Sequence, residues 1–398
     1  MLSPIGDGPS QAADERVRLI PPEILPLFDD TFVRSCQLLE EYVARLALKS
    51  VRAAGLERAC ADGATVDEAI ERAKLDPAVA RVPVAWLLRT LAARGWADRL
   101  TVDGDAARYR IDRALPALDP DELLAAQAAN DERCLPSYRI ASLAADAYAA
   151  VLRGEITGEQ ALFGPEGVVA WSKYFSNANP LYGVANAIGA VAAARALPRQ
   201  GGEVLELGAG FGSGAEALLE RIGATGRANE VSRYRVTDHS AMFLRRAERT
   251  LRARFRGAPL EFHTLDIDRP FAEAGVRPAS CALVFGVNVL HVARDLAATL
   301  AEVRAALVDR GVLAIAECVR PFAGRPVYVE FVFNLLGTFR DPVLAPPWRP
   351  NGGFLTPEQW RAALEANGFT DVQVFPDIAA IREVFPSFVV AAIVATRA

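Results

Sequence analysis

The feature that most constrains the fold is residues 203–214, where an apolar run leads into four glycines at alternate positions. The apolar run predicts a buried strand that ends at Leu207. In a parallel sheet, the loop after such a strand lies at the carboxyl edge, where α/β proteins bind their ligands. Gly208 and Gly210 allow a tight turn and a close approach to a ligand because they have no Cβ atom. Glu206 can accept hydrogen bonds from an ammonium group or, indirectly, from ribose hydroxyls, so the loop suits a nucleoside whose charged end is an amino acid.

This segment resembles the first motif of the class I S-adenosylmethionine (SAM) methyltransferases. The resemblance implies SAM as the cofactor and a Rossmann-like sheet of seven strands, the last of them antiparallel. Two other interpretations stay open for the motif, a dinucleotide-binding turn and a purely structural turn. Residues 210–215 fit the loose dinucleotide pattern, although that register starts two residues late and ignores Glu206. A P-loop is excluded, because no Gly-Lys-Ser/Thr follows.

The second half of the chain, residues 199–398, alternates apolar runs with helical patterns, which predicts an α/β catalytic domain. Strands are expected at 203–207, 234–238, 260–265, 281–287, 311–317, 371–375 and 388–396. Seven strands with a final strand-to-strand exchange match the methyltransferase sheet.

Polar residues follow three of these strands, at the edge where the cofactor is expected. Asp238 can accept from both ribose hydroxyls in a charge-assisted, bidentate arrangement. Ser240 lies in the same turn and belongs to the same group of expected cofactor residues. Asp266 can accept from the adenine amino group while Ile267 flanks the ring, and Asn288 can reach the methionine part. The order and spacing of these residues, after the glutamate of the first motif, favour SAM binding.

Several segments also resemble, as a set, the C-methyltransferase domains of polyketide synthases, and the similarity covers about residues 155–320. The segments are 236–240, 265–267, 288–296 and 313–317. The resemblance implies that His291 and Glu317 form a catalytic dyad. In that family the dyad removes a proton from the carbon between a ketone and a thioester.

Elementary chemistry is consistent with this role. Adjacent parallel strands would bring His291 and Glu317 to the same sheet edge, and a carboxylate on one imidazole nitrogen fixes the tautomer and raises basicity. The alternative is that His291 only caps the following helix and Glu317 only ends a strand. The other two histidines, His239 and His263, are expected to be structural or near the cofactor.

In the first part of the chain, residues 17–115, the sequence pattern predicts three helices followed by a β-hairpin. The expected helices span 22–54, 65–74 with a Thr65–Glu68 capping box, and 77–93, and the expected strands span 95–102 and 108–111. This order resembles the winged-helix domain of small-molecule O-methyltransferases, which implies dimerisation and a wall of the substrate pocket. DNA binding is the alternative, but the third helix has no dense basic face and the turn at 103–105 is acidic.

The segment between these parts, residues 116–198, is expected to be a helical linker that covers the cofactor and substrate. Residues 164–180 interrupt its helical pattern with large aromatic side chains and amides, which suit the wall of a small-molecule pocket. Residues 326–352 are expected to form a lid that selects the acceptor. The expected pocket residues are Trp171, Tyr174, Asn186, Phe331 and Trp348. Aromatic side chains that merely pack helices together are the alternative.

The whole chain of 398 residues has a net charge of −5, which argues against nucleic acid as a main partner. No apolar run reaches the length of a membrane span, no signal peptide is expected, and residues 1–16 look like a disordered tail. Five scattered cysteines without paired spacing indicate buried thiols and a cytoplasmic protein without structural zinc. No metal-ligand cluster surrounds the expected dyad, so no metal is expected.

We therefore expect a cytoplasmic, homodimeric, SAM-dependent methyltransferase of natural-product biosynthesis. It is expected to methylate an activated carbon of a small or carrier-bound acyl substrate. Two alternatives remain at this point. The same histidine could serve O-methylation of a small molecule, or the chain could be a SAM-sensing regulator that uses its winged helix.

Overall fold

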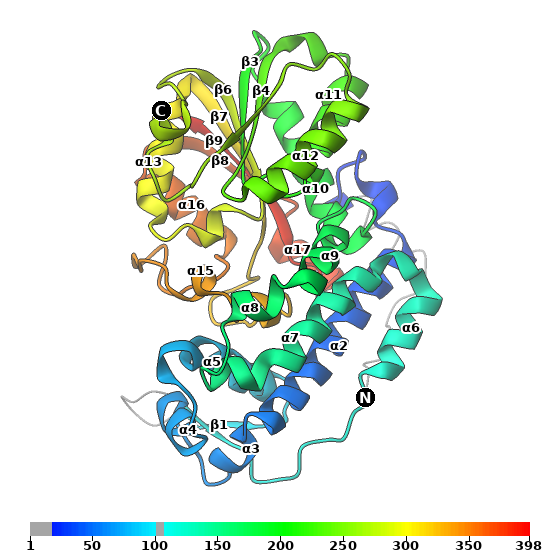
Figure 1. Cartoon of the computed structure of the whole chain (residues 1–398), viewed down its shortest axis with the longest axis vertical. Coiled ribbons are helices and arrows are strands. Elements are labelled where there is room, and N and C mark those ends of the chain that lie inside the picture. The colour runs from blue at the N-terminus through cyan, green and yellow to red at the C-terminus, as the bar shows by residue number, and fades with distance from the viewer. Residues whose placement is uncertain (1–17, 101–106) are drawn as a thin grey trace.

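The computed structural model describes residues 18–100 and 107–398. A helical N-terminal part lies below a domain built on one large sheet (Figure 1). The expected tail, residues 1–16, and the expected hairpin turn, residues 103–105, lie outside the described residues.

Within the described residues, the large sheet has seven strands in the order β5-β4-β3-β6-β7-β9-β8. Its pairings are parallel except that β9 runs antiparallel to both β7 and β8. The strands are β3 (Gly202–Leu207), β4 (Val231–Asp238), β5 (Leu260–Thr264), β6 (Cys281–Val287), β7 (Leu307–Cys318), β8 (Phe369–Phe375) and β9 (Val390–Arg397). The predicted seven-stranded α/β fold with a final antiparallel strand is therefore confirmed.

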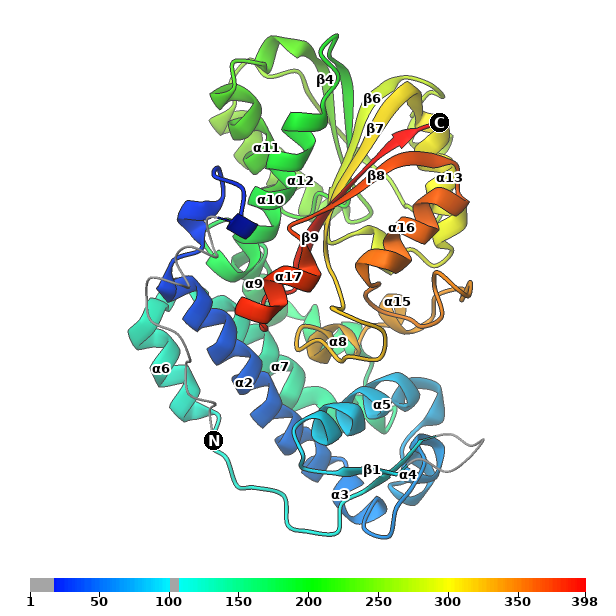
Figure 2. The same cartoon turned by 180° about the vertical axis from the view of Figure 1, so that it is seen from behind.

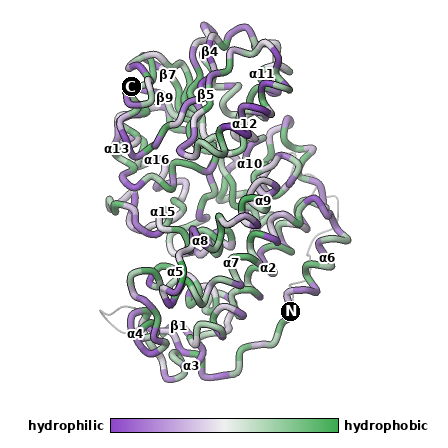
Figure 3. The backbone as a smooth tube through the Cα atoms, viewed as in Figure 1, coloured by the Kyte–Doolittle hydropathy of each residue, from purple (hydrophilic) through white to green (hydrophobic). Residues whose placement is uncertain are grey.

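Helices cover both faces of this sheet. On one side lie α10 (Pro180–Ala196), α11 (Ser213–Ala224) and α12 (Ala241–Arg254), and on the other lie α13 (Leu296–Ala306) and α16 (Pro357–Ala366) (Figure 2). Covered on both faces, the middle of the sheet is largely hydrophobic (Figure 3), and every residue of β6 is buried. Only the strand ends are therefore left to carry polar chemistry.

The N-terminal part has the expected order of helices and hairpin. Its elements are α2 (Asp30–Ala53), α3 (Leu56–Ala59), α4 (Val66–Arg72), α5 (Pro77–Ala93), β1 (Asp98–Leu100) and β2 (Arg108–Arg110). The capping box expected for the second predicted helix is present at the start of α4, with Thr65 and Glu68 exchanging side-chain-to-backbone hydrogen bonds. Within the described residues, β1 begins at Asp98 rather than at residue 95, and β2 ends at Arg110 rather than at residue 111.

Residues 121–174 form four helices that lie between the two parts, namely α6 (Asp121–Asp131), α7 (Leu135–Leu152), α8 (Gly158–Leu162) and α9 (Pro165–Tyr174). The expectation that residues 164–180 interrupt the helical pattern is wrong for α9. Gly164 stands at its N-cap and Pro165 in its first turn, where a missing N–H costs nothing. The aromatic residues of this segment then pack against one another.

Two further short helices, α14 (Glu330–Phe333) and α15 (Gly337–Arg340), follow β7, and α17 (Ile378–Val384) precedes β9. Short 3-10 turns occur at Leu25–Leu27, Glu132–Cys134, Ala228–Glu230, Phe271–Ala274 and Leu290–Val292. Within the described residues, no helix is both long and apolar enough to span a bilayer. All five cysteines lie among the described residues, and they are buried and form no disulfide, as predicted.

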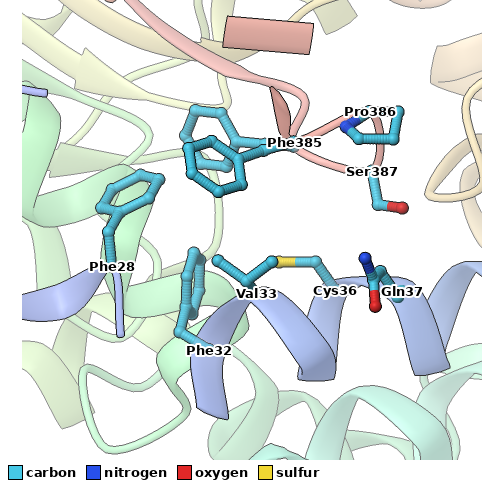
Figure 4. Close-up of a pocket in the computed structure, with 9 residues that line it drawn as sticks. Phe28, Phe32, Val33, Cys36, Gln37, Phe385, Pro386 and Ser387 are labelled. Atoms are coloured by element: carbon cyan, nitrogen blue, oxygen red, sulfur yellow. The ribbon is translucent and has the colours of Figure 1, made fainter. Parts of the chain in front are cut away.

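Aromatic rings connect the N-terminal part to the last strand of the sheet. Phe28 and Phe32, before and at the start of α2, face Phe385 in the turn that leads to β9 (Figure 4). The Phe28 ring lies 4.9 Å from Phe388 and 6.5 Å from Phe385. The pocket left between them is small, about 10 Å³, close to the least volume that holds a single water molecule. This contact is therefore a packed joint between the two parts.

Candidate active site

The glycine loop between β3 and α11 has the geometry that a ligand-binding turn needs. Gly208 has φ +62°, and a Cβ atom built there would lie 2.3 Å from Cγ2 of Val289. Gly210 has φ +55°, but a Cβ atom built there would meet nothing within 4 Å. Gly208 thus lets two loops pack together, whereas Gly210 borders open space that a ligand can approach.

Glu206 lies beneath this loop and faces the start of α11. Its side chain is buried, and the Tyr234 hydroxyl donates a 3.1 Å hydrogen bond to Oε2. Burial raises the pKa of Glu206 to about 8, although hydrogen bonds from Tyr234 and the Ala215 N–H act in the opposite direction. A carboxyl group that is neutral only because it is buried becomes charged again when a cation binds beside it. Its contact with the cofactor stays a prediction.

Asp238, at the end of β4, ties the first loop to the second. One carboxylate oxygen accepts from the Gly210 N–H at 2.8 Å, and the other accepts from the Ser240 N–H at 2.7 Å. Burial raises the pKa of Asp238, and the two N–H bonds oppose this shift. A carboxylate has about four acceptor sites, so two remain for ribose hydroxyls. Ser240 serves as the N-cap of α12.

Asp266, after β5, lies at the same edge and is partly exposed. It accepts from the Asp268 N–H at 3.0 Å, and its other oxygen is 3.7 Å from Nδ1 of the exposed His239. Ile267 is half-buried beside it. His263 instead lies in β5, exposed and 3.4 Å from Glu261.

Asn288 joins the ends of β6 and β7. Its backbone has φ +51°, its N–H donates to the Ala316 carbonyl at 2.7 Å, and its Oδ1 accepts from the Cys318 N–H at 2.8 Å. A hydrogen bond with Asn288 also lowers the pKa of the Tyr182 hydroxyl, which burial raises more strongly. Asn288 therefore sets the turn that leads to the expected histidine.

His291 and Glu317 are in contact and deeply buried. The distance from Nδ1 of His291 to Oε2 of Glu317 is 2.6 Å, and the two side chains are 3% and 0% exposed. The other carboxylate oxygen accepts from the N–H groups of Val289 at 3.1 Å and Leu290 at 2.8 Å. Because a carboxylate only accepts, Nδ1 carries a proton, and in the neutral imidazole this leaves the lone pair on Nε2. That nitrogen has no hydrogen-bond partner among the described residues.

The expected pocket residues fall into two groups. Trp171 is fully buried, its ring stacks on Phe175 at 4.9 Å, and its indole N–H donates to a carbonyl. Phe331 is also fully buried, stacked 4.6 Å from Tyr148. These two positions are those of packing aromatics, which was the alternative interpretation, and their place in a substrate pocket stays a prediction. The half-buried Trp348 lies in the segment expected to be a lid.

Tyr174 and Asn186 lie nearer the cofactor loop. The Tyr174 ring is 5.4 Å from that of Tyr182. Asn186 is fully buried and donates to Oδ1 of Asn177 at 2.7 Å, and Asn177 in turn donates to the Ser213 carbonyl at the start of α11. The Oδ1 atom of Asn186 is buried without a partner among the described residues. Such an acceptor fits a cationic ligand.

Sequence reasoning missed Arg349 and Tyr234. Arg349 is 1% exposed and donates to backbone carbonyls next to the dyad, and Tyr234 supports Glu206. Neither belongs to a motif, and only the folded chain places them at the site. In the described ranges, no group of three or more His, Cys, Asp or Glu side chains is arranged to hold a metal.

Comparisons with known proteins agree with the methyltransferase resemblance. A family model described as "Methyltransferase domain" matches residues 205–313. Methyltransferase calH of Penicillium decumbens is 34% identical over 174 residues, which make up 42% of this chain and 43% of that protein. Two other curated relatives are polyketide synthases. The region matched by this chain makes up 4% of the length of one and 12% of the length of the other. The chain thus spans less than half the length of these relatives.

Solved structures share the fold over nearly the whole chain. The CurJ carbon methyltransferase has a TM-score of 0.74 and 22% identity, with 98% of both chains covered. The trans-methyltransferase CalH, solved with SAH, the demethylated form of SAM, has a TM-score of 0.59 and 20% identity, with 91% of both chains covered. The space beside Gly210, the free acceptor on Asn186 and the buried carboxyl of Glu206 are each compatible with a cationic nucleoside as the ligand. Residues 205–313 of this chain thus match a methyltransferase domain, and the whole chain shares its fold with carbon methyltransferases of known structure.

Proposed function

We propose that the protein transfers a methyl group from SAM to the carbon between a ketone and a thioester, with His291 as the base. The acceptor is an acyl thioester of natural-product biosynthesis, either free or bound to a carrier. The observation that carries this proposal is the buried 2.6 Å contact between His291 and Glu317. It is supported by the likeness to carbon methyltransferases and to polyketide synthases.

The cofactor residues act by position. In this proposal Asp238 would hold the ribose and Asp266 the adenine, while Glu206 and Asn186 would offer acceptors to the ammonium end. When bound, the cofactor would supply a methyl group on a positively charged sulfur. A carbon nucleophile can attack this methyl group, and the sulfur then leaves as a neutral thioether. Holding nucleophile and methyl group in line removes much of the entropic barrier.

The dyad supplies the proton transfer. Glu317 holds the Nδ1 proton of His291, so Nε2 is free to take a proton from the carbon acid. Once His291 is protonated, the adjacent carboxylate stabilises the imidazolium. Because Glu317 is itself fixed by two backbone N–H groups, it cannot turn away to form other contacts. A base positioned in this way contributes about 10²–10⁴ in rate.

The test uses SAM labelled with ¹³C in its methyl group and a β-ketoacyl thioester of N-acetylcysteamine. We expect a new C–CH₃ signal in the product and none in the range of O–CH₃. His291→Gln should lower the rate by about 10²–10⁴, whereas the control His263→Gln, at an exposed site in β5, should leave it unchanged. A label on oxygen, or full activity of His291→Gln, would overturn the proposal.

A further inference from the structure

A single arginine of the expected lid contacts the backbone of the histidine turn. Arg349 is 1% exposed, and its guanidinium donates to the carbonyl oxygens of His291 at 3.0 Å and Ala293 at 2.7 Å. Its own backbone is fixed by a reciprocal pair of hydrogen bonds with Ala345. Arg349 therefore ties the lid segment, defined here as residues 326–352, to the backbone of the histidine turn.

The partners of this guanidinium are unusual for a buried cation. Arg349 forms no ion pair with a described carboxylate, and its Nε–H has no partner in the described part of the chain. Burial lowers the pKa of Arg349, and the charges of Asp268 and Asp295 act in the opposite direction. A buried charge normally has a charged partner. Because the Arg349 guanidinium instead donates to two backbone carbonyls, we infer that its role is to fix the position of those carbonyls.

The turn that it grips has little support of its own. His291 lies in a three-residue 3-10 turn, Leu290–Val292, and the chain enters it through the left-handed Asn288. On the amide side, Glu317 holds the N–H groups of the two residues before the histidine. On the carbonyl side, the hydrogen bonds come from Arg349. The turn is thus clamped between β7 and the lid segment.

Rings from the lid segment and the residues after it complete the clamp. The imidazole centroid is 4.6 Å from the Phe354 ring and 5.9 Å from the Phe339 ring. These rings limit the imidazole sideways, while Arg349 fixes the backbone from which it projects. A displacement of about 1 Å at a reacting group can cost about 10²-fold in rate, so such support is of direct value to a base.

We propose that Arg349 is a positioning residue that sets the orientation of His291 and links it to the seating of the lid segment. This inference rests on the proposed role of His291 as the base. When the lid segment is in the position seen here, Arg349 holds the carbonyls of His291 and Ala293, and the Nε2 atom of His291 has one fixed orientation. When it is displaced, the turn loses its carbonyl-side support.

The test compares Arg349→Met with Arg340→Met and Arg349→Lys. Arg340 lies in the same lid segment but donates to the Leu335 carbonyl and makes no hydrogen bond to the histidine turn in the described residues, so it controls for general damage to the lid. We expect Arg349→Met to lower kcat by about 10–100-fold while KM for the acceptor and Kd for SAH stay within threefold. Arg349→Lys keeps one charged donor and should recover part of the loss.

The chain has only three histidines, so NMR of protein labelled in its histidine rings with ¹⁵N and ¹³C can follow His291 without activity. In the wild type we expect one tautomer with the proton on Nδ1, and in Arg349→Met a mixed or shifted signal for His291 alone. This readout separates the two proposals, because it decides the positioning role even if no carbon is methylated. Should Arg349→Met fail to fold, Arg349→Lys gives the same comparison. An unchanged His291 signal, or equal losses in Arg349→Met and Arg340→Met, would overturn the inference.

Discussion

Glu206→Gln should stabilise the folded protein in a way that depends on pH. The folded carboxyl has a pKa of about 8, against an ordinary value of 4.5. Between these values the folded chain keeps the proton while the unfolded chain releases it, so raising the pH favours unfolding. Glutamine has no proton to lose, and the Tyr234 hydroxyl can bond to it in either direction.

The expected size follows from the two pKa values. Each unit of separation is worth about 1.4 kcal/mol, so the burial of Glu206 costs about 3 kcal/mol at pH 7 and about 5 kcal/mol above pH 8. The stability difference between variant and wild type should therefore be near zero at pH 4.5 and should rise through this window. Urea unfolding of both proteins in parallel, at intervals from pH 5 to pH 8, measures the difference curve. A difference that stays flat across this range would refute the reasoning.

A second assay links the same residue to the cofactor. If the ammonium end of SAM binds beside Glu206, its charge draws off the carboxyl proton, so the wild type should release up to one proton per SAH bound at pH 7. Calorimetry in buffers with different ionisation enthalpies counts these protons, and Glu206→Gln should release none. Equal proton release by both proteins would place the cofactor elsewhere.

Three other substitutions probe the cofactor loop and the aspartate that binds its backbone. Gly208→Ala places a methyl group 2.3 Å from Val289 Cγ2 at a positive φ, so we expect a loss of about 1–3 kcal/mol in urea unfolding, and an unchanged midpoint would contradict this packing. Gly210→Ala meets no atom within 4 Å, so it should weaken SAH binding, measured by calorimetry, more than it lowers stability. In the wild type, the two oxygens of Asp238 each accept from a backbone N–H group. Asp238→Asn replaces one of these oxygens by an NH₂ group, so two donors face each other, and SAH affinity should fall at least about tenfold. An affinity that is retained in this variant would argue against a ribose contact.

The sheet was predictable because most of its strands contain a short apolar run, and helical patterns separate these runs along the chain. The contact between His291 and Glu317 was implied by the resemblance to polyketide synthase C-methyltransferase domains, and the topology agrees with it, since β6 and β7 are parallel neighbours whose ends meet at one edge. Strand boundaries were less accurate. β7 starts at Leu307 rather than at residue 311, because the expected strand left out the less apolar residues before Gly311.

Other parts of the site depend on long-range packing. Glu206 turns beneath its loop because Tyr234, 28 residues away, donates to it, and no local pattern indicates that contact. Arg349 reaches the histidine turn across 58 residues from an irregular segment. Trp171 has the composition of a pocket wall but is buried among other rings, because the segment around it folds into a helix.

The central claim is that His291 removes a proton from carbon. Solvent deuterium uptake at the acidic carbon of a β-ketoacyl thioester, measured by NMR with SAH in place of SAM, tests it without methyl transfer. We expect the wild type to accelerate this exchange well above the buffer rate, and His291→Gln to return it to that rate. Exchange that persists in His291→Gln, or is absent in a wild type that still transfers methyl groups, would contradict the account.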